Sequence, residues 1–432
     1  MNNDIIKLLN LECFSLNIKT IDVVKKNDGV FCYITLNQIT SSCPFCGGTN
    51  PPIKEYKIKK IKHSITNDSP CFLIYRARRY KCKYCNSTFY EVNPFSKKYS
   101  KCSTSTIIKV LNYLKEHTRT FTSVANDLFL NVKTVINIFD KYVDYNRTRL
   151  PEIICFDEVY TSKKLYNKYA FIMADFFKSK IIEVYSSRRK DRLTQNFSTI
   201  PKEERDNVRY IIIDMWESYK DLAKIYFKNA KIAVDSFHVI QHLNNAMIAI
   251  RLKIMRKFDK RSKSLLANDE YYYMLRKFHY FFVKDYGKIY DGLIEIRKFR
   301  TKWTKDFIRK YLLSIDEDLT YAYYLKEEYR EFSLTANYET CDDEFESLID
   351  KFTNSHLEEF REFGKLLIHW KENIKNSFIR INNKRLSNGP IEGINSKVKT
   401  MMKEANGFIN FSRFRNRVIY SINKDVPFKN IK

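Results

Sequence analysis

Two short apolar runs in this chain each end in an aspartate, and a glutamate follows the start of a helix predicted far downstream. Asp157 follows residues 154–156, and Asp214 follows residues 210–213. Such runs are typical of buried strands, and in open α/β sheets functional groups collect beyond the carboxyl ends of strands. Together with Glu392 these aspartates would form an oxygen-lined site for divalent cations. Two Mg²⁺ ions held there could activate an attacking oxygen and stabilise the leaving oxygen of a phosphodiester.

Each of these acidic residues also has a simpler explanation. Aspartate commonly ends strands in turns, and Glu158, beside Asp157, could be the true ligand. A glutamate in the first turn of a helix is favoured by the helix dipole whatever its role. Gly389 and Gly393 flank Glu392, however, and close approach of the backbone is their simplest explanation. We therefore base the prediction on the three carboxylates together.

Alternating strands and helices between residues 151 and 238 predict how the two aspartates meet. The predicted strands are 152–157, 169–176, 180–186, 208–214 and 231–235, with helices at about 192–199 and 218–227. Three consecutive strands followed by β-α units describe a mixed sheet of the ribonuclease H type. In that topology the first strand is central and the fourth lies next to it. Asp157 and Asp214 would then end adjacent strands.

Two CxxC pairs near the N-terminus have the chemistry of a zinc site. They are Cys43 with Cys46 and Cys82 with Cys85, and four thiolates suit a closed, tetrahedral Zn²⁺ site. The gap between the pairs spans 35 residues, which is longer than the simple pattern. We therefore expect strands inserted between the two knuckles of a zinc ribbon. A redox pair is the alternative, although it would need only one CxxC.

Basic residues before the second CxxC pair are candidate DNA contacts. Arg76, Arg78 and Arg79 are interleaved with aromatic residues in the strand that leads to Cys82, as on surfaces that follow a phosphate backbone. A solvated charged face is the alternative.

A helix-turn-helix is predicted next in the chain. Apolar residues recur at helical spacing from 104 to about 116, with Ser103 or Thr104 as N-cap, and a short helix and a further helix follow around a break at Asn131. The last helix would present Lys133, Thr134 and Asn137 to DNA. Phe129 lies where glycine or a small residue usually opens the turn. A plain three-helix linker domain is the alternative.

Composition is consistent with a polyanionic partner. The 432 residues exceed the size of a typical single domain, and 77 Lys+Arg against 50 Asp+Glu give a formal net charge of +27. A compositional bias toward lysine could have the same effect. We find no apolar run long enough to cross a membrane and no secretory leader. The sparse cysteines favour a reducing compartment.

Four segments resemble the motif blocks of the ISL3 family of bacterial insertion-sequence transposases: ICFDEVYTSKK, YIIIDMWESY, AVDSFHVIQHLNNAMIAIR and SNGPIEGINSKVKTMMKEANGFINFSRFRNRV. The knuckles CPFCGG and YKCKYCNSTFYE precede them in the order of that family. The resemblance spans nearly the whole chain and is weakest over residues 252–380.

This resemblance implies a DDE transposase with a ribonuclease H-like core. It would use Mg²⁺ or Mn²⁺, bind the terminal inverted repeats of its element and target DNA as a homo-oligomer, and work at the bacterial nucleoid in the cytoplasm. Asp157, Asp214 and Glu392 would be the catalytic metal ligands. His238, in Asp235-Ser-Phe-His, would hold the flanking phosphate or a nearby side chain, unless it only caps a helix.

The predicted division of the chain follows from these motifs. It comprises an N-terminal segment 1–40, a zinc ribbon 41–95, a helix-turn-helix 100–148, a first part of the core 151–240, an all-helical insertion 241–385 and a last part 386–432. Arg413, Arg415 and Arg417 in that last part are candidates for gripping the DNA backbone, with a solvated helix face as the alternative.

Two other functions are compatible with these modules. One is a transcriptional regulator whose α/β region is not catalytic, and the other is a ribonuclease H-like nuclease that recognises DNA structure.

Overall fold

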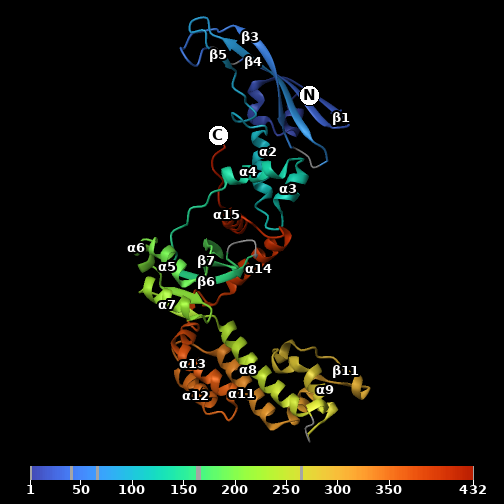
Figure 1. Ribbon diagram of the computed structural model, residues 1–432, viewed down its shortest axis with the longest axis vertical. Coiled ribbons are helices and arrows are strands. Elements are labelled where there is room, and N and C mark those ends of the chain that lie inside the picture. The colour runs from blue at the N-terminus through green and yellow to red at the C-terminus, as the bar shows by residue number, and fades with distance from the viewer. Residues whose placement is uncertain (1, 39–41, 65–67, 162–166, 263–265, 432) are drawn as a thin grey trace. The chain divides into compact units, whose positions relative to one another are not determined.

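The computed structural model describes residues 2–38, 42–64, 68–161, 167–262 and 266–431 (Figure 1). The chain divides into two compact units. The first unit contains residues 1–148, 159–170 and 394–432, and the second contains residues 149–158 and 171–393. Both ends of the chain therefore belong to the first unit. Among the helices of the described ranges, none has the length and apolar character needed to span a membrane.

The first unit begins with a twisted sheet. After helix α1 (Asn2–Leu8), the strands are β1 (Ile18–Lys26), β2 (Gly29–Leu36), β3 (Ile53–Lys62), β4 (Cys71–Lys81) and β5 (Thr88–Tyr90). Their order is β1-β2-β4-β3, and β5 pairs with β4. Strands β3 and β4 lie in sequence between the two CxxC pairs, which confirms the prediction of inserted strands. One face packs on a core that includes Leu11, Leu73 and Phe95.

Three helices follow the sheet: α2 (Thr104–Tyr113), α3 (Phe121–Asp127) and α4 (Val132–Tyr142). Ser103 is the N-cap of α2, and its side chain accepts a hydrogen bond from the backbone N–H of Thr106. The core of these helices also contains Tyr420 and Ile431 from the C-terminal region, where α15 spans Phe411–Ile422. The C-terminal helix thus completes a small domain that begins 300 residues earlier, a feature that local sequence patterns did not predict.

The second unit is built on a five-stranded sheet. Its strands are β6 (Ile153–Tyr160), β7 (Tyr169–Asp175), β8 (Lys180–Tyr185), β9 (Tyr210–Ile213) and β10 (Lys231–Val234), in the order β10-β9-β6-β7-β8. Strand β9 pairs in parallel with both β6 and β10, and β7 pairs antiparallel with β8. The first strand of this group is central and the fourth lies beside it, as predicted. Helices α5 (Lys190–Ser198), α6 (Lys202–Asp206) and α7 (Glu217–Tyr226) connect the later strands.

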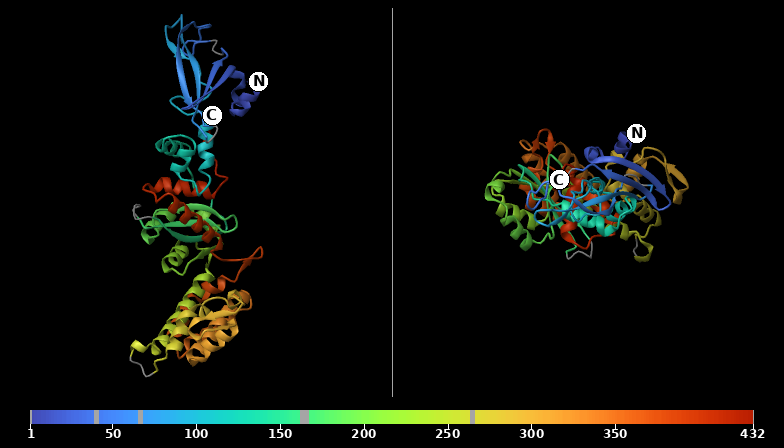
Figure 2. Two further views of the ribbon diagram at one scale, coloured as in Figure 1. Left: turned by 90° about the vertical axis from the view of Figure 1, so that its right-hand side faces the viewer. Right: turned by 90° about the horizontal axis from the view of Figure 1, so that it is seen from above.

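The region between β10 and the last part of the chain is mainly helical. Its helices are α8 (Ser236–Lys257), α9 (Asp269–Lys277), α10 (Lys305–Ser314), α11 (Glu317–Thr335), α12 (Asp342–Thr353) and α13 (Glu358–Asn376). Helix α8 contacts α11 and α13, and α12 contacts α13 (Figures 1 and 2). The prediction of an all-helical insertion is wrong, because short β-hairpins lie within residues 241–385. A short hairpin of β11 (Ile294–Ile296) and β12 (Thr301–Trp303) interrupts it, and Arg300 adopts the left-handed conformation at the turn.

This insertion is fastened to the edge of the sheet. Strand β10 is an edge strand, and the backbone carbonyl of Ile232 accepts hydrogen bonds from the side-chain amides of Asn373 (3.1 Å) and Asn376 (2.9 Å) in α13. Edge strands expose unpaired backbone groups. The two buried asparagines satisfy one such group, and a single apolar core runs from the sheet through the helices. After the hairpin of β13 (Arg380–Ile381) and β14 (Lys384–Arg385), helix α14 spans Gly389–Glu404.

Candidate functional site

Three aspartates lie on three adjacent parallel strands in the second unit, at the edge of the sheet where two of the strands end. Asp214 directly follows β9 and Asp235 directly follows β10, and the N–H of Asp235 donates to the carbonyl of Ile213 at 3.0 Å. The register pairs Ile153 with Tyr210 and Cys155 with Ile212. Continued by two residues, this register sets Asp157 beside Asp214.

The prediction that Asp157 ends its strand is wrong. Strand β6 continues to Tyr160, and Asp157 lies within it. The physical reason is that β6 has neighbours on both sides. Its partner β9 stops at Ile213, whereas β7 lies along the other edge of β6 in the sheet. The carboxylate of Asp157 therefore projects from a continuous strand at the point where the neighbouring parallel strand has ended.

The two aspartates interact strongly through their charges. Burial and the nearby Asp214 raise the pKa of Asp157 to about 8, against a hydrogen bond from the N–H of Glu158 that favours the charged form. His238 lies with its Nε2 3.0 Å from Oδ1 of Asp214, and this contact raises the pKa of His238. A carboxylate beside another carboxylate is stabilised by a proton or by a cation. The site thus has excess negative charge, which His238 offsets in part.

Asn388 connects these strand ends to helix α14. Its side-chain amide donates to Oδ1 of Asp214 at 3.0 Å and to the carbonyl of Phe156 at 3.3 Å, and the residue is 1% exposed. Its backbone N–H donates to the carboxylate of Asp235. Its carbonyl accepts from the N–H of Glu392 at 3.0 Å. Sequence reasoning missed this residue, although an asparagine before Gly-Pro is a usual helix N-cap.

Glu392 lies exposed in the first turn of α14. Its charge helps to raise the pKa of the buried Asp235, after the larger effect of burial itself. Of the residues that the structure describes, only the four cysteines near the N-terminus bring three or more ligand atoms within 4.8 Å of one another. The carboxylates of Asp157, Asp214 and Glu392 are thus not all within 4.8 Å of one another. The strand register sets Asp157 beside Asp214, and Asn388 connects Glu392 to Asp214.

Glu158 is the competing candidate ligand next to Asp157. The hydroxyl of Tyr219 donates to its Oε2 at 2.6 Å, and Arg188 forms an ion pair with its Oε1. The guanidinium of Arg188 stacks over the ring of Trp216 at 4.0 Å. Both carboxylate oxygens of Glu158 are thus engaged by side chains of the protein. These contacts fix the carboxylate of Glu158 against Tyr219 and Arg188.

The four predicted zinc ligands lie together in the first unit. The Sγ atoms of Cys43 and Cys85 are 3.7 Å apart, and those of Cys46 and Cys82 are 3.5 Å apart. A tetrahedron with Zn–S distances of about 2.3 Å has sulfur–sulfur edges of about 3.8 Å. The cysteine cluster therefore fits a structural Zn²⁺ ion.

The three arginines of β4 have different surroundings. Arg76 is exposed, and its guanidinium lies 4.8 Å from the centroid of the Tyr56 ring. Arg79 pairs with Glu55 at 2.6 Å on the surface. Arg78 pairs with Glu91 at 2.9 Å and also donates to the carbonyl of Leu36. These contacts hold the guanidinium of Arg78 against Glu91 and Leu36, so the prediction that Arg78 contacts DNA is wrong.

Helix α4 begins directly after Asn131, at the break predicted from the sequence. Lys133 and Asn137 are exposed and Thr134 is half-buried, while the opposite face is buried. Asn131 is its N-cap and accepts from the N–H of Lys133 at 2.8 Å. Phe129 has a φ of 52°, in the left-handed region. A residue in this conformation opens the turn where glycine is usual.

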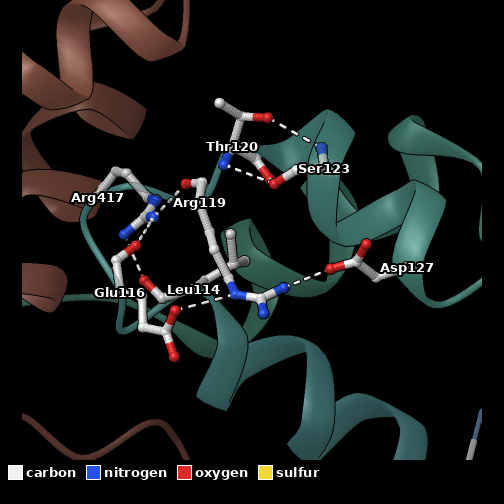
Figure 3. A network of polar contacts seen from close by, with 7 residues as sticks. All are labelled: Leu114, Glu116, Arg119, Thr120, Ser123, Asp127 and Arg417. Carbon is white, nitrogen blue, oxygen red and sulfur yellow. Dashed lines mark hydrogen bonds and ion pairs between the residues drawn. The ribbon is translucent and has the colours of Figure 1, made fainter. Parts of the chain in front are cut away.

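The three arginines of α15 hold parts of the protein together. The guanidinium of Arg417 donates to the carbonyls of Leu114, Glu116 (2.8 Å) and Arg119 (2.7 Å), all at the connection between α2 and α3 (Figure 3). With 1% of its surface exposed, Arg417 has no access to DNA, so this prediction is wrong. Sequence position alone did not indicate that a folded domain would bury this cation.

The other two arginines of α15 are also engaged by the protein. Arg413 forms an ion pair with Asp140 of α4 at 2.6 Å, and Arg415 donates to the carbonyl of Tyr145 at 3.1 Å. These contacts join α15 to α4 and to the segment after it. Part of the donor capacity of each guanidinium is thus used within the protein, and their contact with DNA stays a prediction.

Comparison with known families gives two matches. A family model described as a transposase, DDE_Tnp_ISL3, matches residues 154–418, which is more than half of the chain. A second model, described as the zinc-finger of transposase IS204/IS1001/IS1096/IS1165, matches residues 40–85. No curated protein matches the chain. The first match includes every residue of the carboxylate site described above, and the second includes all four cysteines.

Proposed function

This chain belongs to the ISL3 family of transposases, and from that premise we propose that it binds the terminal inverted repeats of its own insertion sequence and catalyses DNA cleavage and strand transfer. The observation that carries the proposal is the pair of carboxylates on adjacent parallel strands, Asp157 within β6 and Asp214 directly after β9. Asn388 connects this pair to the first turn of α14, which contains Glu392. A DDE site would form when the carboxylate of Glu392 closes on this pair.

We propose a ribonuclease H-like fold for the catalytic sheet. The order β10-β9-β6-β7-β8 supports it, because the central first strand and the adjacent fourth strand provide the two aspartates. The helical insertion lies between the second aspartate and the glutamate in sequence. Asn373 and Asn376 fasten it to the edge strand β10, so the insertion also braces the sheet behind the site.

The donor set fits Mg²⁺ or Mn²⁺, since carboxylate oxygens are the ligands that these hard cations prefer. Asp157, Asp214 and Glu392 would hold the metal, which when bound activates the attacking oxygen and stabilises the leaving oxygen of the phosphodiester. The raised pKa of Asp157 supports this assignment, because the carboxylate pair needs a cation to carry two negative charges. His238 holds Oδ1 of Asp214 and so orients that carboxylate.

DNA recognition is assigned to the first unit. We propose that α3 and α4 form a helix-turn-helix, in which Lys133, Thr134 and Asn137 contact DNA. The exposed α4 face and the left-handed Phe129 support this role. Zn²⁺ at the four cysteines would fix the far end of the sheet, where Arg76 and Arg79 lie on β4. Assembly on two element ends would make the protein a homo-oligomer on DNA in the bacterial cytoplasm.

Mobilisation of a marked element in cells tests this proposal. We expect Asp157→Ala, Asp214→Ala and Glu392→Gln to abolish mobilisation while the purified proteins still bind the element ends. Glu404→Gln is the matched control, because Glu404 is an exposed glutamate in the last turn of the same helix. Undiminished mobilisation by any of the three site variants would refute the assignment of that residue.

A further inference from the structure

A large groove in the first unit has not been given a role. It has a volume of about 1670 Å³ and lies between strands β3 and β4, the segment from Tyr90 to Lys101, and the C-terminal residues near Phe428. Small-molecule pockets usually have volumes of about 300–1000 Å³. The size and open form of this groove are better suited to part of a polymer.

The charged lining of the groove is almost entirely positive. It consists of one glutamate, Glu91, and five lysines: Lys59, Lys60, Lys97, Lys98 and Lys101. The carboxylate of Glu91 already pairs with Arg78 at 2.9 Å. The ammonium of Lys60 lies over the rings of Phe72 and Phe31, which do not line the groove. Lys59, Lys98 and Lys101 therefore carry the positive charge on which the inference depends, and this charge attracts an extended polyanion.

Cationic side chains lie over two tyrosine rings that line the groove, those of Tyr90 and Tyr99. Lys59 lies 5.0 Å from the centroid of the Tyr90 ring, and Arg79 lies 5.4 Å from the same centroid. Lys98 lies 5.2 Å from the centroid of the Tyr99 ring, which is 93% exposed. A protein that stacks bases needs open ring faces. At the lining residues Tyr90 and Tyr99, the ammonium groups of Lys59 and Lys98 lie over the rings, and such cations suit contacts to phosphate.

The segment from Lys97 to Lys101, which lines one side of the groove, is hydrogen-bonded to strand β3. The N–H of Lys62 donates to the carbonyl of Lys101 at 2.8 Å, and the N–H of Ser103 donates to the carbonyl of Lys62 at 2.9 Å. The buried His63 hydrogen-bonds the hydroxyl of Ser103 at 2.8 Å and the carbonyl of Leu9 at 2.7 Å. The groove is therefore preformed, and binding would not first have to order this segment.

We propose that this groove binds the phosphate backbone of duplex DNA and supplies a contact that is independent of base sequence. The inference rests on the proposed function, since it assumes that DNA is the ligand of the first unit. Helix α4, in the same unit, would read base edges, and the groove would hold the backbone of the same duplex. Lys98 and Lys101 are the exposed lysines of the segment from Lys97 to Lys101, and the test therefore replaces these two residues.

The test measures the salt dependence of binding by full-length protein. The probes are a duplex with the element's terminal repeat and a scrambled duplex of equal length. Each phosphate contact contributes about 0.9 to the slope of log K against log salt concentration, so a Lys98→Gln/Lys101→Gln variant should reduce the slope by about 1.8 on both duplexes. Lys302→Gln/Lys310→Gln, which removes two exposed lysines of the helical insertion, should leave the slope unchanged.

Three outcomes would overturn the inference. These are an unchanged slope in the groove variant, an equal fall in the control variant, and tighter binding of a single strand than of the duplex. The proposed function fails differently, by the absence of metal-dependent cleavage. A slope difference without cleavage would support the groove alone, and cleavage with an unchanged slope would support the transposase alone.

Discussion

The side-chain amide of Asn388 donates a hydrogen bond to Oδ1 of Asp214 across 174 positions of sequence, at 3.0 Å. His238 contacts the same oxygen from the start of α8, also at 3.0 Å. Oδ1 of Asp214 is thus held from two sides by neighbouring groups. Because the carbonyl of Asn388 also accepts from the N–H of Glu392, one buried residue couples the second aspartate to the predicted third carboxylate.

We predict that Asn388→Ala lowers the cleavage rate and raises the Mg²⁺ concentration needed for half-maximal cleavage. Groups that orient metal ligands typically contribute about 10- to 100-fold to metal affinity or activity, and we expect an effect in this range. Cleavage of a terminal-repeat duplex over a series of Mg²⁺ concentrations is the measurement. Binding of the duplex should be unchanged. Asn229→Ala, at an exposed asparagine, is the control, and equal metal dependence in the two variants would contradict the prediction.

Replacement of the carboxylate by an amide should have different effects on cleavage at Asp157 and at Glu158, which are neighbours in β6. We predict that Asp157→Asn abolishes cleavage, because it removes a metal ligand, whereas Glu158→Gln retains part of the activity. Tyr219→Phe should resemble Glu158→Gln, since the first removes the donor of the 2.6 Å hydrogen bond between these side chains and the second removes the charge of its acceptor. The double variant of Glu158 and Tyr219 should then be little worse than either single variant. Additive losses, or full loss in Glu158→Gln, would instead make Glu158 a ligand.

The zinc cluster should be required for DNA binding and not for the fold of the second unit. We predict that the purified protein contains one Zn²⁺ per chain and that Cys46→Ser lowers this content and weakens duplex binding. The reason is that the four thiolates join the ends of β3 and β4 through one ion. Metal analysis and binding assays measure both effects. Cys341→Ala, in the second unit, should keep the zinc. Full zinc content in Cys46→Ser would refute the assignment.

The parts of this structure that follow from local patterns were predictable from the sequence. Apolar runs such as residues 210–213 become strands because burial favours them, and their succession implied the strand order. Asn388 and Arg417 were not predictable in this way, because their roles depend on partners 174 and about 300 positions away. A buried arginine and a surface arginine have the same local sequence pattern. Only the folded domain shows that three backbone carbonyls surround Arg417.

Arg417 should be essential for the stability of the helical domain in the first unit. We predict that Arg417→Met lowers the free energy of unfolding of that domain by about 2–5 kcal/mol, because three carbonyls, including that of the buried Leu114, lose their charged donor. The three tryptophans all lie in the second unit. Their fluorescence therefore serves as an internal control, and hydrogen exchange of α2 and α3 reports the change. Arg413→Met, which breaks a half-exposed ion pair, should cost only about 0–1 kcal/mol. Equal protection of α2 and α3 in both variants would contradict the role given to Arg417.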